Sequence, residues 1–182
     1  MSGVRRVIAG VDGSLGSLQA LRCAAEEARG RDALLVAIIA WLPPGGELAE
    51  RRYPSPYLRQ IWRDAAWDRL LGAFDAGLGG FPDEVPVEPR VVRGEPGPAL
   101  VDSAADPGDL LVIGTGRRGL RRAMSRSVSR YCLAHARCPV TAIPPSALME
   151  ETARGDHLWP LRRGLRHSAL VPDLPGDWPG RP

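Results

Sequence analysis

Residues 110–129 read LLVIGTGRRGLRRAMSRSVS, which joins an apolar run to a loop rich in glycine and arginine and then to a serine-rich segment. The run Leu110 to Ile113 predicts a strand buried on both faces, and we expect a helix from about Ser125 to His135. Such a junction offers free backbone N–H groups, the positive end of a helix dipole and guanidinium groups at one place. The stretch therefore predicts a site for an anion such as a phosphate.

The same alternation of strand and helix runs through the chain. Strands are expected over Val4–Val11, Ala33–Trp41, Val85–Val92, Leu110–Ile113 and Pro139–Ile143. Helices are expected over Ser14–Gly30, Leu58–Leu78, Pro96–Ala105 and Ser125–His135, with a loop from Pro43 to about Pro56. This order predicts an α/β fold, a doubly wound five-stranded parallel sheet with helices on both faces, Rossmann-like or of the adenine-nucleotide alpha-hydrolase type. Because the third strand carries prolines and glutamates, we place it near an edge.

Ligands of doubly wound sheets bind at the carboxyl ends of strands, where the strand order reverses. Two loops are candidates to line that crevice, Val11–Ser14 after the first strand and Gly114–Ser129 after the fourth. Asp12 either forms a turn with Gly13 or recognises a polar edge of a ligand.

Six arginines with no acidic residue between them follow the fourth strand: Arg117, Arg118, Arg121, Arg122, Arg126 and Arg130. They form either a solvated surface or an anion site at the start of a helix. Ser127 and Ser129 either donate hydroxyl groups to phosphate oxygens or cap the helix. Nucleic acid is not an expected partner, since no aromatic residues are interleaved with these arginines for base stacking.

Residues 114–119, GTGRRG, match the G-x-G-x-x-G pattern of dinucleotide-binding proteins. That pattern belongs after the first strand, with an acidic residue at the end of the next strand. Here it follows the fourth strand, and no acid lies near Pro139 to Ile143. A Rossmann dehydrogenase is therefore not expected.

Composition indicates one packed domain and an extension. The chain has 182 residues, 44% of them hydrophobic, with a formal net charge of +3. We expect a domain over residues 1–146 and a flexible tail rich in Pro, Gly and Arg over residues 147–182, unless its apolar segment docks on a surface. No signal-peptide pattern and no apolar run long enough to span a membrane are present, so we expect a cytoplasmic protein with no membrane partner.

The chain lacks the residue patterns of common enzyme classes. There is no G-x-S-x-G elbow, no Ser-His-Asp order and no paired carboxylate, and the histidines and cysteines lack metal-ligand spacing. We expect Cys23, Cys132 and Cys138 to be reduced thiols. No catalytic residue and no metal ligand is predicted, and the protein is expected not to be an enzyme beyond slow ATP hydrolysis at most.

Three segments together carry a family resemblance: VIAGVDGS at residues 7–14, IIAW at residues 38–41, and VIGTGRRG with SRSVSRYCLAHARCPVTAIP over residues 112–144. Over about residues 1–145 the chain resembles the universal stress protein family. Many members bind ATP through a loop of the form G-x-x-G, nine residues, then G-[S/T]. The resemblance implies ATP or another adenine nucleotide as ligand, with Mg²⁺ accompanying it. It places Val11, Asp12, Ala40 and Trp41 near the adenine, Ile113 and Gly114 beside the ribose and phosphates, and Gly116, Ser127, Val128 and Ser129 around the phosphate tail.

The loop departs from the family pattern at two positions. Gly114 and Gly116 are one residue closer than in G-x-x-G, and Arg126 stands where members have glycine. Glycine lets the backbone approach a phosphate closely, so Arg126 either occupies the phosphate site or supplies charge to the ligand. In the first case Trp41 could likewise fill the adenine pocket.

Two functions follow from these alternatives. The protein is either a regulatory module that responds to an adenine nucleotide, or a dimeric scaffold that has lost the nucleotide. Family members commonly pair through the last strand. Because Pro139 to Ile143 would form an open edge, we expect a homodimer, with unknown further protein partners.

Overall fold

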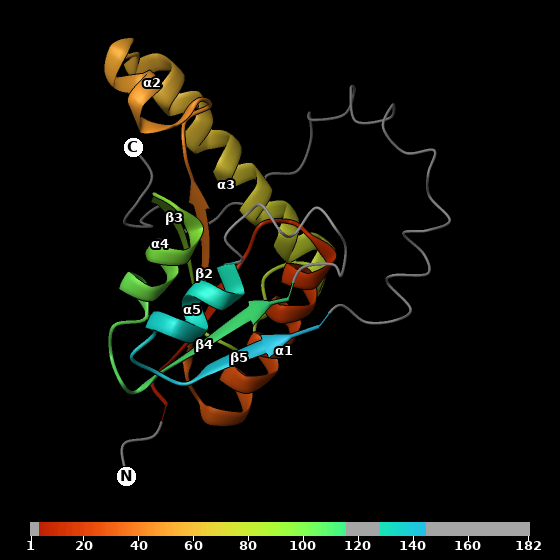
Figure 1. Cartoon of the computed structure of the whole chain (residues 1–182). Helices are drawn as coiled ribbons and strands as arrows, with labels where there is room; N and C mark the ends of the chain where they lie inside the picture. Colours follow the sequence, from red (N-terminus) through yellow and green to blue (C-terminus); the bar gives the residue numbers. More distant parts are fainter. Residues whose placement is uncertain (1–3, 116–127, 145–182) are drawn as a thin grey trace. The chain divides into compact units, whose positions relative to one another are not determined.

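The computed structural model describes residues 4–115 and 128–144. These residues form a parallel five-stranded sheet with helices on both faces (Figure 1), which confirms the expected fold class. The strands are β1 (Arg6–Gly10), β2 (Leu34–Trp41), β3 (Val87–Arg93), β4 (Asp109–Gly114) and β5 (Val140–Ile143). The helices are α1 (Leu15–Arg31), α2 (Gly46–Arg52), α3 (Pro56–Leu78), α4 (Pro96–Ser103) and α5 (Val128–His135).

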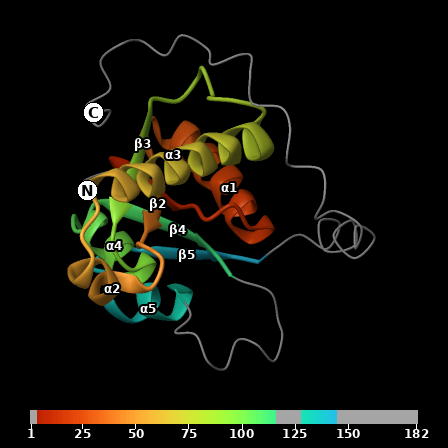
Figure 2. The same cartoon turned by 90° about the horizontal axis from the view of Figure 1, so that it is seen from above.

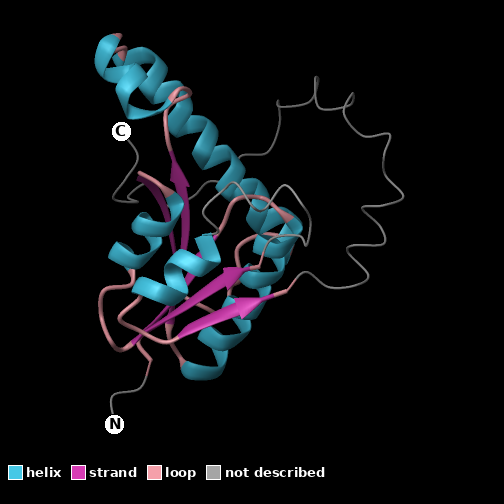
Figure 3. Ribbon diagram, viewed as in Figure 1, coloured by secondary structure: helices cyan, strands magenta, loops and turns pink. Residues whose placement is uncertain are grey.

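The order of the strands across the sheet is β3-β2-β1-β4-β5, and all neighbouring strands are parallel (Figure 3). The chain builds β2 and β3 to one side of β1, then crosses over and adds β4 and β5 on the other side. The direction of winding therefore reverses between β1 and β4. The loops that follow these two strands leave the same edge of the sheet.

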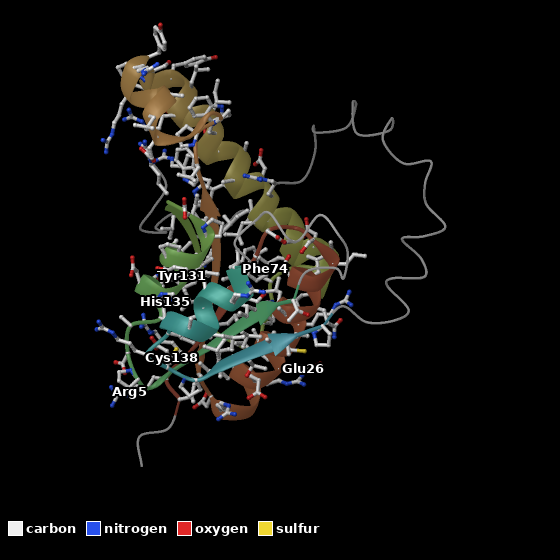
Figure 4. All side chains as sticks on the ribbon, viewed as in Figure 1. Arg5, Glu26, Phe74, Tyr131, His135 and Cys138 are labelled. Atoms are coloured by element: carbon white, nitrogen blue, oxygen red, sulfur yellow. The ribbon has the colours of Figure 1, made fainter. Side chains whose placement is uncertain are left out.

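Strand alternation divides the core between the two faces of the sheet. Odd-numbered residues of β1 and β2 face α1 and α3, and even-numbered residues face α4 and α5. Figure 2 shows these two pairs of helices on opposite sides of the sheet. Phe74 of α3 (labelled in Figure 4) is fully buried on the first face. Its ring stacks on that of Phe81, with ring centroids 4.3 Å apart. On the second face Tyr131 of α5 lies against Gly97 of α4, where a Cβ would be 2.8 Å from the tyrosine ring.

Helix α2 lies where the sequence predicted a loop. The run Pro43-Pro44-Gly45-Gly46 correctly marks a break, but a helix follows it at once, capped by no side chain. Apart from Gly46, its residues are strong helix formers, a local signal that the prediction did not use. Ion pairs anchor the helix to the rest of the fold. Glu47 and Glu50 on α2 both form ion pairs with Arg93 at the end of β3, and Glu50 also accepts a hydrogen bond from Arg59 Nε of α3 at 2.6 Å.

The prediction that Gly30 ends the first helix is wrong. Helix α1 continues to Arg31, and Asp32 takes the left-handed conformation at φ +50°, with its N–H directed at the carbonyls of Ala28 and Arg29. Asp is one of the few residues with a side chain that visits this region. Gly30 is thus an ordinary exposed position in the last turn of the helix.

None of the described helices is long and apolar enough to cross a membrane.

A buried ion pair fixes the amino ends of β1 and β4. Asp109 is 1% exposed and receives two hydrogen bonds from Arg6, at 2.9 Å from Nε and 2.7 Å from a terminal guanidinium nitrogen. The Asp106 backbone N–H adds a third at 3.2 Å. The Arg6 side chain remains 29% exposed, so only one member of the pair is cut off from water.

This asymmetry predicts unequal costs of removing either partner. Arg6→Met leaves a buried carboxylate without its cation and should lower the free energy of unfolding by about 3 kcal/mol. Asp109→Asn leaves a guanidinium that reaches water and should cost roughly half as much. Urea unfolding followed by circular dichroism measures both; an equal or larger loss for Asp109→Asn would contradict this account.

Candidate functional site

The candidate site lies at the carboxyl ends of β1 and β4, the adjacent strands at which the winding reverses. The loop after β1 and the first turn of α1 contribute one wall. The carboxyl end of β4 and the start of α5 form the other wall. This is the position expected from the sequence for a ligand in a doubly wound sheet.

The loop after β1 is held by hydrogen bonds within residues 12–17. The Asp12 carboxylate accepts the Ser14 N–H at 2.8 Å, and Ser14 Oγ accepts the Ser17 N–H at 3.3 Å as the helix cap. Ser17 Oγ accepts the Asp12 N–H at 3.2 Å and donates to the Ser14 carbonyl at 2.9 Å. Gly13 has φ +82°, which this tight turn requires. The turn role of Asp12 is thus present, and the loop needs no ligand to be ordered.

The charge of Asp12 is stabilised by the same contacts. Partial burial of the carboxylate would raise the pKa of Asp12, but hydrogen bonds from Ser14 and Ser17 outweigh it and hold the pKa below the usual value for aspartate. The residue itself is exposed. An ionised, fixed carboxylate at this position accepts hydrogen bonds from a ligand N–H or O–H group.

Gly114, the last residue of β4, is enclosed by the first turn of α1. A Cβ on Gly114 would lie 2.5 Å from the carbonyl carbon and oxygen of Gly16 and 2.8 Å from the Ser17 nitrogen. A Cβ on Gly16 would in turn lie 3.1 Å from the Thr115 carbonyl oxygen. Two backbones therefore touch here without side chains between them. On the side that faces α1, Gly114 allows the strand and the helix to pack closely, a role that the sequence did not predict for it.

The start of α5 closes the other flank of β4. Ser129, 8% exposed, donates its hydroxyl to the Gly114 carbonyl at 3.1 Å. A hydroxyl has one hydrogen to donate, so in this arrangement Ser129 offers a ligand only its lone pairs. Val128 packs into the apolar cluster that contains Ile113, which is 2% exposed.

Ala40 and Trp41 face opposite sides of the sheet. The register between β1 and β2 ends at Gly10 and Ile38, so both residues extend past β1. Trp41 is 6% exposed and packs in the cluster of α1 and α3, with the Arg93 guanidinium 5.8 Å from its ring centroid. Ala40 is half-buried and, by alternation, faces the side of α4 and α5. The sequence placed both beside one ligand ring, but only one of them can present its side chain to a given face.

Sequence reasoning missed two hydroxyl residues of this region. Ser17 links the loop to α1, and the spacing Ser14-x-x-Ser17 resembles a capping box, which was an available signal. Thr115 donates both its N–H and its hydroxyl to the Ile143 carbonyl, at 2.7 and 3.3 Å, and so ties the end of β4 to the end of β5. Nothing local in the sequence marks Thr115 for this contact.

Three predicted contacts, Gly116, Arg126 and Ser127, lie outside the described residues, as do the other arginines up to position 122. Within residues 4–115 and 128–144, no group of three or more His, Cys, Asp or Glu side chains is arranged to hold a metal ion. The three cysteines are unpaired; Cys132 is buried, and Cys23 and Cys138 are half-buried. Burial raises the pKa of the Cys132 thiol to about 11.

A hollow of about 520 Å³ lies elsewhere, between β3 and α4, and its lining includes Arg6, Arg90 and Arg93. Each of these arginines already has a carboxylate partner: Asp109, Glu88 and the pair Glu47 and Glu50, respectively. Their charges are thus compensated within the fold, and the hollow is a weaker candidate for an anion.

Comparison with known proteins matches residues 3–144 to the model of the universal stress protein family. A universal stress protein whose crystal structure was solved in complex with cAMP is 27% identical, with a TM-score of 0.51, and the match covers 80% of this chain and all of that one. No curated protein sequence matches the chain.

Two further solved structures share the fold. The universal stress protein UspA of Lactobacillus plantarum is 22% identical, with a TM-score of 0.55, over 79% of this chain and 99% of its own. A universal stress protein of Archaeoglobus fulgidus is 21% identical, with a TM-score of 0.50, over 78% of this chain and 94% of its own.

The contact at Gly114 predicts opposite effects of the same substitution at two glycines. Gly114→Ala forces a methyl group into the backbone of α1 and should lower the free energy of unfolding by about 1–3 kcal/mol or more. Gly30→Ala, where a Cβ meets nothing within 4 Å, should raise it by roughly 0.5–1 kcal/mol. Thermal unfolding of both variants checks this, and a neutral Gly114→Ala would show that the two backbones are not in contact.

The lowered pKa of Asp12 predicts a dependence on pH. The carboxylate stabilises the fold above its unfolded pKa of about 3.9, and this contribution is lost as pH falls through the lower folded value. Asp12→Asn keeps an acceptor for the Ser14 N–H but removes the charge, so it should cost below about 1 kcal/mol at pH 7. The stability difference between wild type and Asp12→Asn should shrink below about pH 4. Urea unfolding from pH 3 to 7 measures it; a difference that grows toward low pH would contradict the assignment.

Proposed function

This chain belongs to the universal stress protein family, and we propose that it is a regulatory module which binds an adenine nucleotide at the loops after β1 and β4. The observation that carries the proposal is the pre-formed loop of residues 12–17 at the reversal of the sheet. Its ionised Asp12 is exposed and held by Ser14. A fixed acceptor at the carboxyl ends of the strands suits the exocyclic amine of adenine or a ribose hydroxyl.

The relative solved with cAMP supports an adenine nucleotide as the class of ligand. In our proposal Asp12 and Ala40, with Val11 and Trp41 behind them, lie near the adenine. The ribose and phosphates are flanked by Ile113, Gly114, Val128 and Ser129. Further contacts to the phosphates come from Gly116, Arg126 and Ser127. Mg²⁺ would accompany a triphosphate and bind through it, since no acidic cluster is available among the described residues.

We further propose that two copies pair through β5. Among the described strands, β5 has a neighbour on one side only and contains no charged residue and no proline. The opposite edge strand, β3, carries Glu88, Pro89 and Arg90, features that discourage edge pairing. Pro139 to Ile143 is thus the edge better suited to a second chain.

A nucleotide-free dimeric scaffold is the second candidate, and one feature of the site favours it. The Ser129 hydroxyl donates to Gly114, and α1 encloses the other side of Gly114. A ligand would find the groups at the end of β4 already engaged with the protein.

Titration calorimetry separates the two candidates. Protein stripped of nucleotide is titrated with Mg-ATP, AMP and cAMP at physiological salt. The proposal expects binding with a Kd on the order of micromolar, equivalent to about 8 kcal/mol, and weaker binding for Asp12→Asn, whose loop remains folded. No binding up to millimolar nucleotide would favour the scaffold.

Arg126 decides whether the loop is a working or a degraded phosphate site. If it contacts phosphate, Arg126→Ala should weaken Mg-ATP binding by roughly tenfold or more, the usual size of a charge-assisted hydrogen bond. If Arg126→Gly instead creates or strengthens affinity, the arginine occupies the site. Calorimetry on both variants, with circular dichroism to verify folding, distinguishes these results.

A further inference from the structure

Helix α2 is attached to the rest of the protein by charge and not by apolar packing. It belongs to residues 44–54, which we call the strap and which lie beyond the carboxyl end of β2 (Figure 1). Glu50, at 6% exposure, is the one buried residue of the strap, whereas Leu48 is 76% exposed. A helix of 7 residues is too short to be stable alone. The strap therefore stays in place through the partners of its glutamates.

Two arginines from different elements converge on the carboxylate of Glu50. Arg59 Nε of α3 donates to one oxygen at 2.6 Å, and a terminal nitrogen of Arg93, the last residue of β3, donates to the other. Arg93 also donates two hydrogen bonds to Glu47, at 3.0 and 2.7 Å. Guanidinium groups are the usual protein partners of carboxylates and phosphates. Arg59 and Arg93 thus form a clamp, which carboxylates of the strap occupy.

The clamp is positioned by parts of the fold other than the strap. The Arg93 guanidinium lies 5.8 Å from the ring centroid of Trp41, and the N–H of the next residue, Gly94, donates to the Trp41 carbonyl at 2.9 Å. Arg59 lies in the first turn of α3, a helix of 23 residues. The side chains of Arg59 and Arg93 are 43% and 34% exposed. Both arginines therefore have a place in the fold without the strap, and water already reaches part of the clamp.

The strap is built to leave the clamp at low cost. The attraction of Glu50 to its two arginines is offset by the cost of removing its charge from water, and this cost is recovered when the strap opens. Gly45 and Gly46, just before α2, have φ +82° and +76°, and no side chain caps the helix. Glycines of this kind let the backbone change direction with little strain. The structure thus provides a hinge before α2 and a detachable anion within it.

We propose that Arg59 and Arg93 are a binding site for a small phosphate anion, and that the strap blocks this site with its own glutamates. Because Glu47 and Glu50 together bring two negative charges, an anion that displaces them has to carry at least two. The anion and the strap cannot pair with the same guanidinium groups at once, so binding of the anion opens the strap. The clamp lies apart from the loops after β1 and β4, and the proposal does not depend on a nucleotide binding there.

Titration calorimetry with inorganic pyrophosphate tests the site on the full-length protein. Glu47→Gln combined with Glu50→Gln removes the internal competitor and should strengthen pyrophosphate binding by about tenfold or more. Adding Arg59→Gln to this double variant should abolish the gain, while pyrophosphate bound elsewhere would be unaffected. Circular dichroism verifies that each variant is folded. Equal affinity of wild type and the double variant, or a gain that survives Arg59→Gln, would overturn the proposal.

A matched control separates the clamp from the general effect of removing negative charge. Glu27→Gln combined with Glu84→Gln also removes two carboxylates, each paired with an arginine of α1 and distant in sequence from the strap. This variant should bind pyrophosphate as wild type does. A gain as large as that of the strap variant would show that net charge, and not the clamp, controls the affinity, and would overturn the proposal.

Hydrogen exchange followed by mass spectrometry tests the opening of the strap. In wild type, pyrophosphate should raise the exchange rate of the backbone amides of residues 46–53 several-fold above the rate in sodium chloride of equal ionic strength. Chloride screens ion pairs but does not replace them. Peptides from α1 provide the internal reference and should exchange equally in both salts. Equal exchange of the strap in the two salts would show that pyrophosphate does not displace it, which would contradict the proposed competition.

Discussion

The contact between the backbones of Gly114 and the Gly16–Ser17 turn is the constraint on which the candidate site depends. A side chain at Gly114 would lie 2.5 Å from the α1 backbone, so β4 and α1 can approach only because this strand ends in glycine. The approach places the loop of residues 12–17 directly beside the end of β4. Without it, the two loops of the site would be separated by the width of a side chain.

The same contact gives Gly114 a structural role that is separate from ligand binding. The resemblance to the family implies that Gly114, the first glycine of the loop, lies beside the ribose and phosphates of a ligand. In this fold Gly114 meets protein on the α1 side and, through its carbonyl, the Ser129 hydroxyl on the α5 side. A match to a ligand-binding pattern is thus compatible with a purely structural need for the same residue. The proposed binding of a nucleotide therefore depends on groups that the fold leaves available, of which the Asp12 carboxylate is the clearest.

The periodic parts of the sequence were sufficient to predict the strands, the layers of the fold and the position of β3 near an edge of the sheet. Leu110 to Ile113 and Ala33 to Trp41 are apolar on both faces because both strands are interior, and β3 is less apolar because it is an edge. Helix α2 was missed because Pro43 to Gly46 marks a break and the short run of helix formers after it was taken as part of a loop; Arg59 and Arg93, which pair with Glu50, fix the helix in place. Gly30 was misassigned because Asp32 takes the left-handed position that glycine usually fills. The two errors thus have different causes: a short helical run was overlooked after a break, and an aspartate takes a conformation that usually belongs to glycine.

The site shows the same division between local and distant information. The Asp12–Ser14 turn could be predicted, since an aspartate followed by glycine and serine forms it from neighbouring atoms alone. The opposite facing of Ala40 and Trp41 follows from alternation along a single strand, a local rule that was not applied when both residues were placed beside one ligand. Ser17 likewise acts on neighbours in its own loop, Asp12 and Ser14, whereas Thr115 acts on Ile143, a residue of another strand. Predicting a ligand site from sequence therefore works best for residues whose geometry is determined by neighbours a few positions away in the chain. A residue at the end of a strand has to be assigned to a face of the sheet before it is assigned to a ligand.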